Sequence, residues 1–132
     1  MDQGIIKRND LIYPELSYKI VGILFDVYNS LGYGHKENSY QKATALGLRN
    51  NNLNFKEQLY IPIEYQSRII GSNYLDFLVE DKIILEIKKG DRFSKTHIDQ
   101  VYRYLINSNL QLGILAYFSP NKIHFKRIVN VF

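Results

Sequence analysis

The sequence predicts an α/β (α+β) fold in which a mixed central sheet is flanked by helices. Two segments with helical spacing come first, followed by three strand-like segments, a third helix and two more strands, in the order ααβββαββ. The chain has 132 residues and shows no repeat or linker, which predicts a single domain over residues 1–132. Its composition, 45% hydrophobic and 23% charged, is ordinary for a soluble globular protein.

The first helix is predicted from about residue 16 to residue 31. Residues 1–14 read as a loose lead-in that ends at Pro14. After it, apolar residues recur at three- and four-residue spacing up to Leu31, and Gly32 follows as a plausible C-cap.

Two further helices are predicted from their boundaries. One covers about 36–50, between the break GYGH and the run NNNLN. The other covers about 94–107, where Ser94 is a suitable N-cap. The buried stripe of this helix is expected to contain Ile98, Val101, Tyr102 and Leu105.

Five strands are predicted from short apolar runs between turn signals. They cover residues 55–65, 68–80, 82–89, 112–118 and 122–132. Pro62 cannot donate a ladder hydrogen bond, so the first strand is expected at a sheet edge or with a bulge.

Composition excludes several classes of chemistry. The chain has no cysteine, so disulfides, thiolate metal sites and cysteine nucleophiles are excluded. A bound metal would be held by oxygen or imidazole, which favours Mg²⁺ or Mn²⁺. The N-terminus lacks a signal-peptide pattern and no apolar run is long enough for a bilayer, so we expect a cytoplasmic location without a membrane partner. The net charge of +4 is compatible with a nucleic-acid partner but does not require one.

Two acids and a lysine interrupt the otherwise apolar hairpin YLDFLVEDKIILEIKKG. If residues 80–82 form a three-residue loop, Val79 pairs with Ile83, and counting outward places Asp76 opposite Glu86. A two-residue loop would shift the register and separate the acids. The other face of the hairpin is then expected to carry Leu75, Phe77, Val79, Ile83, Leu85 and Ile87.

Lys88 follows Glu86 by two residues and is therefore expected on the acidic face. Two carboxylates this close raise each other's proton affinity. Lys88 would offset one charge, whereas a divalent cation would offset both and take the oxygens as ligands. A solvent-exposed face with an ordinary Glu86–Lys88 ion pair explains the same spacing, and the spacing alone does not choose between the two.

These residues resemble a known superfamily. Asp76, followed by Glu86-Ile87-Lys88, resembles the D…ExK core of the PD-(D/E)XK nuclease superfamily. The segment GHKENSY, residues 34–40, resembles the signature of the GxxExxY protein family. The segment HIDQVYRYL contains Gln100 and Tyr104, which are similar to the Q-x-x-x-Y helix motif of the superfamily.

The resemblance continues to the end of the chain and spans about residues 16–129. LGILAYF and KRIV are similar to the closing strands of the family, although Tyr117 stands where an asparagine is expected. The resemblance implies a restriction-endonuclease-like core in which Glu37, Asp76 and Glu86 meet around a Mg²⁺ ion, with Mn²⁺ as a substitute.

The resemblance also implies roles for individual residues. Asp76, Glu86, the Ile87 carbonyl and Glu37 would be metal ligands. Lys88 would orient the attacking water or stabilise developing negative charge. Gln100, one helical turn before Tyr104, would orient Lys88 or the water. The residues expected to contact nucleic acid are His97, Tyr104, Lys89, Arg92, Lys95 and Arg103.

Each role has a structural alternative. Glu37 suits a helix N-terminus by charge alone. Gln100 and Tyr104 could be a solvated side chain and a packing tyrosine, and a lone histidine such as His97 is more often structural.

The leading hypothesis is a small Mg²⁺-dependent nuclease that favours DNA over RNA. A binding module that keeps the nuclease fold without cleaving is the second hypothesis, and a hydrolase of another phosphoester is the third. A homodimer would hold two metal sites a fixed distance apart, as a duplex cutter needs.

Overall fold

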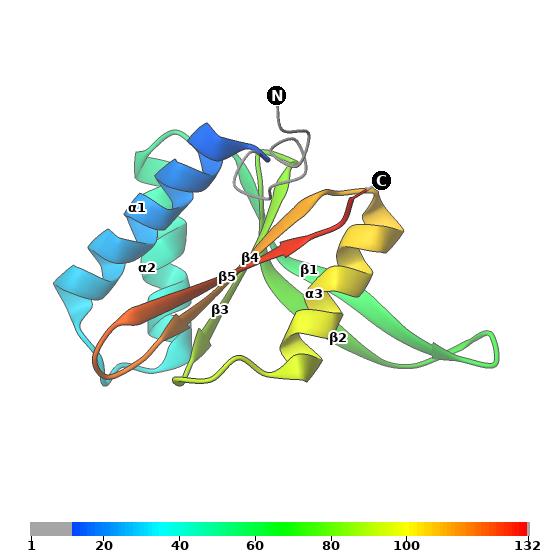
Figure 1. Ribbon diagram of the computed structural model, residues 1–132. Coiled ribbons are helices and arrows are strands. Elements are labelled where there is room, and N and C mark those ends of the chain that lie inside the picture. The colour runs from blue at the N-terminus through cyan, green and yellow to red at the C-terminus, as the bar shows by residue number, and fades with distance from the viewer. Residues whose placement is uncertain (1–11, 132) are drawn as a thin grey trace, which may run out of the picture.

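The computed structural model describes residues 12–131, so most of the predicted lead-in and Phe132 lie outside the described residues. The predicted order of elements is confirmed (Figure 1). The elements are α1 (Pro14–Leu31), α2 (Glu37–Asn50), β1 (Phe55–Tyr65), β2 (Arg68–Val79), β3 (Ile83–Lys89), α3 (Lys95–Ser108), β4 (Leu112–Phe118) and β5 (Ile123–Val129).

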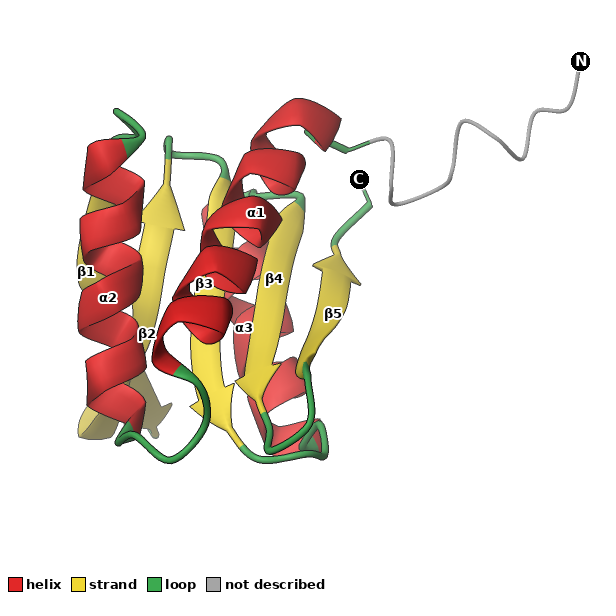
Figure 2. Ribbon diagram, turned by 90° about the vertical axis from the view of Figure 1, so that its left-hand side faces the viewer, coloured by secondary structure: helices red, strands yellow, loops and turns green. Residues whose placement is uncertain are grey.

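The five strands form one mixed sheet in the order β1-β2-β3-β4-β5. β3 and β4 are parallel and are connected through α3, whereas the other neighbours are antiparallel. Helices α1 and α2 cover one face of the sheet and α3 covers the other (Figures 1 and 2). The parallel pair therefore has both faces covered, as parallel strands require.

Two apolar clusters hold these layers together. One lies between the sheet and α1 and α2, and it includes Leu24, Tyr40, Phe77 and Ile87. The other lies between the sheet and α3, and it includes Leu59, Leu75, Val101 and Leu105. Successive side chains of β3 point alternately into the two clusters. Ile84 belongs to the cluster on the α3 side, and the next residue whose side chain points to that side is an acid, Glu86.

The helix boundaries follow the predicted signals. α1 begins at Pro14, which suits the first helical turn, and it ends at Leu31, where the C-cap Gly32 has a positive φ of 69° that favours glycine. Ser94 caps α3 by accepting a hydrogen bond from the Thr96 N–H at 3.2 Å. The predicted burial of Tyr102 is wrong, since its side chain is 42% exposed. Within residues 12–131, no helix is both long and apolar enough to cross a membrane.

β1 is an edge strand, as Pro62 predicted. The ladder between β1 and β2 shifts register next to this proline, between Ile63 and Glu64. The outer parts of β1 and β2 form a hairpin that projects beyond the helices (Figure 1), and its residues are mostly exposed.

Candidate functional site

The loop that joins β2 to β3 has the predicted length. Val79 pairs with Ile83, and the Lys82 N–H donates to the Val79 carbonyl at 2.9 Å. Glu80 and Asp81 both have positive φ, 54° and 55°. Acidic residues adopt this conformation at less cost than β-branched ones. The three-residue loop fixes the register that brings Asp76 and Glu86 together.

Beyond Phe77 and Leu85 the ladder between β2 and β3 ends, and the two acids fill the gap. Asp76 Oδ2 accepts the Ile87 N–H at 2.7 Å, and Glu86 Oε1 accepts the Asp76 N–H at 2.9 Å. Each carboxylate thus takes the place of a backbone carbonyl on the facing strand. Without them, two buried amides would lack acceptors where the strands separate.

The same irregularity makes one predicted position wrong. Leu75 was expected on one face with Phe77, but it packs in the cluster under α3 whereas Phe77 packs under α1 and α2. The ladder between β1 and β2 skips the position of Gln58 and Asp76, and Gln58 has a φ of 53°. Strict alternation therefore fails across Asp76, opposite the irregular backbone at Gln58.

The acid pair is almost inaccessible, with exposed fractions of 6% for Asp76 and 2% for Glu86. Burial raises the pKa of both groups because it removes water from the charged forms. For Glu86, the nearby charge of Asp76 adds to this effect, and its pKa rises from 4.5 to about 8. Without another cation, the pair therefore holds a proton at neutral pH.

Lys88 is the cation that faces the pair. Its Nζ lies 3.3 Å from Glu86 Oε2, and its side chain is 23% exposed. Burial alone would lower the pKa of Lys88, but the carboxylates of Glu86, Glu37 and Asp76 outweigh burial and raise it. Lys88 is therefore charged and oriented, and the predicted pairing with Glu86 is confirmed.

Helix α2 brings two more polar side chains to this place. Its first turn lies at the end of β3 (Figure 2), where Glu37 Oε1 accepts the Lys89 N–H at 3.1 Å. One turn later, Gln41 Nε2 donates to Asp76 Oδ1 at 2.9 Å. Gln41 was not predicted as a site residue. Its position four residues after Glu37, on the same helix face, is the signal that could have revealed it.

The expected cage of three acids is not found. Within residues 12–131, no three acidic, histidine or cysteine side chains gather closely enough to hold a metal ion. Glu37 does not join Asp76 and Glu86 because its carboxylate is bonded to the end of β3. The acids that meet are two, not three.

Gly34 and Tyr40 of GHKENSY have structural roles. Gly34 has a φ of 111°, which favours glycine in the loop before α2. Tyr40 is fully buried; its hydroxyl donates to the Gly32 carbonyl at 2.7 Å, and its ring stacks on Phe118 with centroids 4.3 Å apart. Tyr40 therefore anchors the loop that places Glu37.

His97 on α3 lies close enough to Lys88 and Glu37 for their charges to shift the pKa of its ring, which Lys88 lowers and Glu37 raises. Gln100 is half-buried on the same helix and makes no side-chain hydrogen bond to the part of the chain that is described. Tyr104 lies about two turns beyond His97, packs against the apolar cluster under α3 and lines a hollow beside the projecting hairpin. The predicted role of Gln100 in orienting Lys88 or the water, and the predicted contact of Tyr104 with nucleic acid, stay predictions.

Of the predicted basic residues, Lys89, Arg92 and Lys95 lie between the end of β3 and the start of α3, and Arg103 lies further along α3. Lys89 Nζ lies 4.9 Å from the centroid of the Tyr33 ring, and Lys95 forms an ion pair with Asp99 at 2.7 Å. Arg92 and Arg103 are exposed. Their role in binding nucleic acid stays a prediction.

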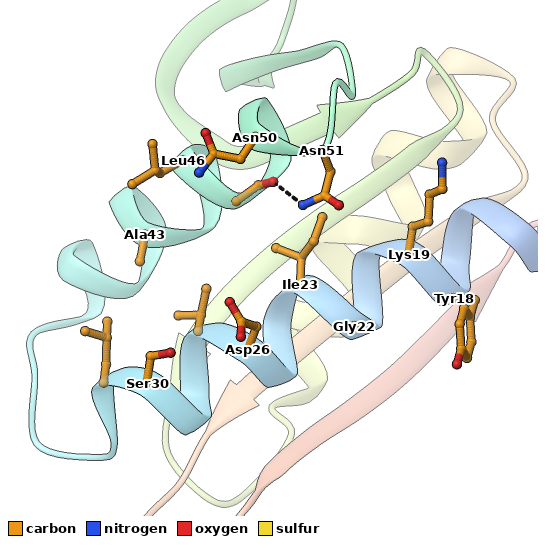
Figure 3. Close-up of a pocket in the computed structure, with 13 residues that line it drawn as sticks. Tyr18, Lys19, Gly22, Ile23, Asp26, Ser30, Ala43, Leu46, Asn50 and Asn51 are labelled. Carbon is orange, nitrogen blue, oxygen red and sulfur yellow. Dashed lines mark hydrogen bonds between the residues drawn. The ribbon is translucent and has the colours of Figure 1, made fainter.

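A separate groove lies between α1 and α2, away from the acid pair (Figure 3). Ile23 and Asp26 point from α1 toward α2, and Lys19 lies nearer the start of α1. Gly47 allows the close approach of the two helices, since a Cβ at this position would lie 2.6 Å from Ile23 Cγ2. The groove brings together none of the predicted site residues.

Comparison with known proteins places the chain in a family. The sequence model of the PD-(D/E)XK nuclease superfamily matches residues 14–128. The chain therefore belongs to the PD-(D/E)XK nuclease superfamily, whose members are generally nucleases. No curated protein matches the chain. A solved structure described as "Crystal structure of SSO0001" is similar, with 16% identity over 89% of this chain and 78% of that chain, and a TM-score of 0.47.

Proposed function

We propose that this protein is a divalent-metal-dependent nuclease that hydrolyses phosphodiester bonds of nucleic acid. The observation that carries the proposal is the buried Asp76–Glu86 pair with Lys88 beside it, in a chain of a nuclease superfamily. The segment GHKENSY further supports a place in the GxxExxY family. The preference for DNA over RNA rests on the resemblance alone.

The chemistry of the acid pair fits a hard divalent cation such as Mg²⁺ or Mn²⁺. Two buried carboxylates face a single lysine, and burial together with mutual repulsion suppresses their ionisation. A divalent cation would compensate both charges and displace the proton. Asp76, Glu86 and the Ile87 carbonyl would hold it. Two carboxylates suffice for Mg²⁺, which commonly keeps several waters and takes substrate phosphate oxygens as further ligands.

A bound cation would supply Lewis-acid activation of the scissile phosphate and of the attacking water. Lys88 carries a fixed positive charge next to Glu86 and would stabilise negative charge that develops on the phosphate oxygens. Gln41 holds the Asp76 carboxylate in one orientation. Glu37 fixes the end of β3, which carries Lys88, and would reach a metal-bound water rather than the metal itself.

The nuclease proposal is tested by cleavage of labelled single-stranded, double-stranded and branched DNA and RNA with Mg²⁺, Mn²⁺ or EDTA. We expect cleavage with either metal and none with EDTA. Asp76→Asn and Glu86→Gln keep the shape and the hydrogen-bond acceptor of each side chain but remove its charge, so both should abolish cleavage, as should Lys88→Ala.

The matched control is Asp81→Asn in the loop of the same hairpin, where the side chain is 78% exposed. It should cleave as the wild type does. Wild-type protein that binds nucleic acid equally with and without metal and cuts no substrate would instead establish a non-catalytic binding module.

The partners of the site are nucleic acid and, as a further proposal, a second copy of the chain. The cationic side chains around the end of β3 support the first. The dimer would set two sites at a fixed separation, and sedimentation equilibrium would detect it.

A further inference from the structure

Tyr117 and His97 link β4 to the start of α3 beside Lys88. Tyr117 is the ladder partner of Lys88 in the parallel pair, so the two side chains emerge on the same face of the sheet. The Tyr117 hydroxyl lies 2.5 Å from His97 Nδ1, and the Ser94 N–H donates to the same hydroxyl at 3.3 Å. The ring of Tyr117 is 3% exposed.

The contacts of the Tyr117 hydroxyl favour one tautomer of His97. A phenol hydroxyl both donates and accepts hydrogen bonds. The Ser94 N–H occupies an acceptor position on this oxygen, which favours donation of the hydroxyl proton to His97 Nδ1. A neutral ring that accepts at Nδ1 carries its proton on Nε2.

The surroundings of His97 also keep the ring neutral. Burial lowers the pKa of His97, Lys88 on β3 lowers it further, and Glu37 on α2 opposes the shift. The carboxylate of Asp99, on its own helix, is paired with Lys95.

The aromatic side chains around Tyr117 fix the hydroxyl that binds His97. The Phe93 ring contacts Tyr117 edge-on with centroids 4.7 Å apart, and it also contacts the ring of His124, the ladder partner of Tyr117 on β5. The Tyr117 ring is thus packed and cannot swing away from His97. The His97 Nε2 atom has no hydrogen-bond partner among residues 12–131, while the ring itself is only half-buried.

We propose that Tyr117 is a positioning residue that orients His97, and that the His97 Nε2–H donates a hydrogen bond to a phosphate oxygen of a nucleic acid held beside Lys88. The proposal rests on the proposed nuclease function and adds a neutral donor to the cation of the site. Lysine provides a point charge, whereas an oriented N–H gives direction to the contact.

The alternative is that Tyr117 and His97 only attach α3 to β4. A purely structural pair would set the same tautomer of His97 and would affect stability when it is broken, but the affinity for nucleic acid would not depend on it. The tautomer therefore tests the orientation of His97, and the affinity separates the two alternatives without a cleavage assay.

The first experiment is long-range ¹H–¹⁵N correlation NMR of the histidine rings in metal-free protein at pH 7.5. We expect His97 as the Nε2–H tautomer in the wild type and a mixture of tautomers in Tyr117→Phe, which keeps the packed ring. An Nδ1–H tautomer in the wild type would overturn the proposal.

The second experiment measures binding of a fluorescent DNA oligonucleotide to metal-free protein. A hydrogen bond to a charged phosphate contributes roughly a tenfold change in affinity, so His97→Ala should bind about tenfold more weakly. His97→Gln, whose amide offers an N–H near the position of Nε2, should recover part of the loss.

The two proposals fail in different ways. Wild-type protein that cleaves DNA, with folded His97→Ala of unchanged affinity, refutes the role of His97 alone. Wild-type protein that neither binds nor cleaves any nucleic acid refutes both proposals.

Discussion

Glu86→Gln should stabilise the metal-free protein at pH 8, although it removes an acid from the centre of the site. Burial and the neighbouring Asp76 raise the pKa of Glu86 from 4.5 to about 8. One pKa unit corresponds to about 1.4 kcal/mol, so ionising this carboxyl in the folded protein costs several kcal/mol. Glutamine keeps the acceptor for the Asp76 N–H and avoids that cost.

The sign of the pH dependence follows from proton binding. Between pH 4.5 and about 8, the folded protein retains a proton on Glu86 that the unfolded chain has released. The free energy of unfolding of the wild type should therefore fall as pH rises through this window. Glu86→Gln should show a shallower fall, because the contribution of Glu86 is removed while that of Asp76, whose pKa is also raised, remains.

Urea denaturation at pH 5, 6, 7 and 8 in the presence of EDTA measures both effects. Asp81→Asn, in the exposed loop, should follow the wild-type pH profile. The reasoning is refuted if the wild type is equally stable or more stable at pH 8 than at pH 5, or if Glu86→Gln is less stable than the wild type at pH 8.

Three further predictions concern the surroundings of the site. Tyr40→Phe removes a buried hydrogen bond that closes the loop before α2 and should lower the free energy of unfolding by about 1–2 kcal/mol in urea titrations; an unchanged value would contradict the anchoring role. Gly47→Ala should cost about 1–3 kcal/mol in the same titrations, despite the better helix propensity of alanine, because the new Cβ meets Ile23; a stabilised variant would show that the helices move apart freely. Arg103→Ala should lower the slope of log affinity against log salt for DNA by about one unit, measured by fluorescence anisotropy, whereas Arg49→Ala, beside Phe55 on the opposite side of the sheet, should leave the slope unchanged. Equal slopes for the two variants would exclude Arg103 from the interface.

Local patterns were sufficient to predict the elements and the hairpin. Helical periodicity, the Gly32 and Ser94 caps and the apolar runs all act over a few residues, and the structure confirms them. The three-residue loop was predictable because only that length places an unbroken apolar series opposite the acids. The pairing of Val79 with Ile83 confirms it.

The parts that failed depend on contacts between distant segments. The alternation rule assumes a regular strand, whereas in β2 the alternation is broken at Asp76, and Leu75 packs on the other face of the sheet from Phe77. The partner of Glu37 is a backbone N–H at Lys89, 52 positions further along the chain, and backbone groups leave no mark in a sequence. Gln41 had no signal apart from its helical spacing to Glu37.

Titration calorimetry with Mn²⁺ at pH 7, in two buffers of different ionisation enthalpy, tests most directly whether the buried acid pair is a metal site. The wild type and Asp81→Asn should each bind Mn²⁺ and release a proton into the buffer, so that the measured heat changes with the buffer. Asp76→Asn and Glu86→Gln should bind far more weakly. A wild type that takes up no Mn²⁺, or an Asp76→Asn variant that binds it as tightly as the wild type, would contradict the account.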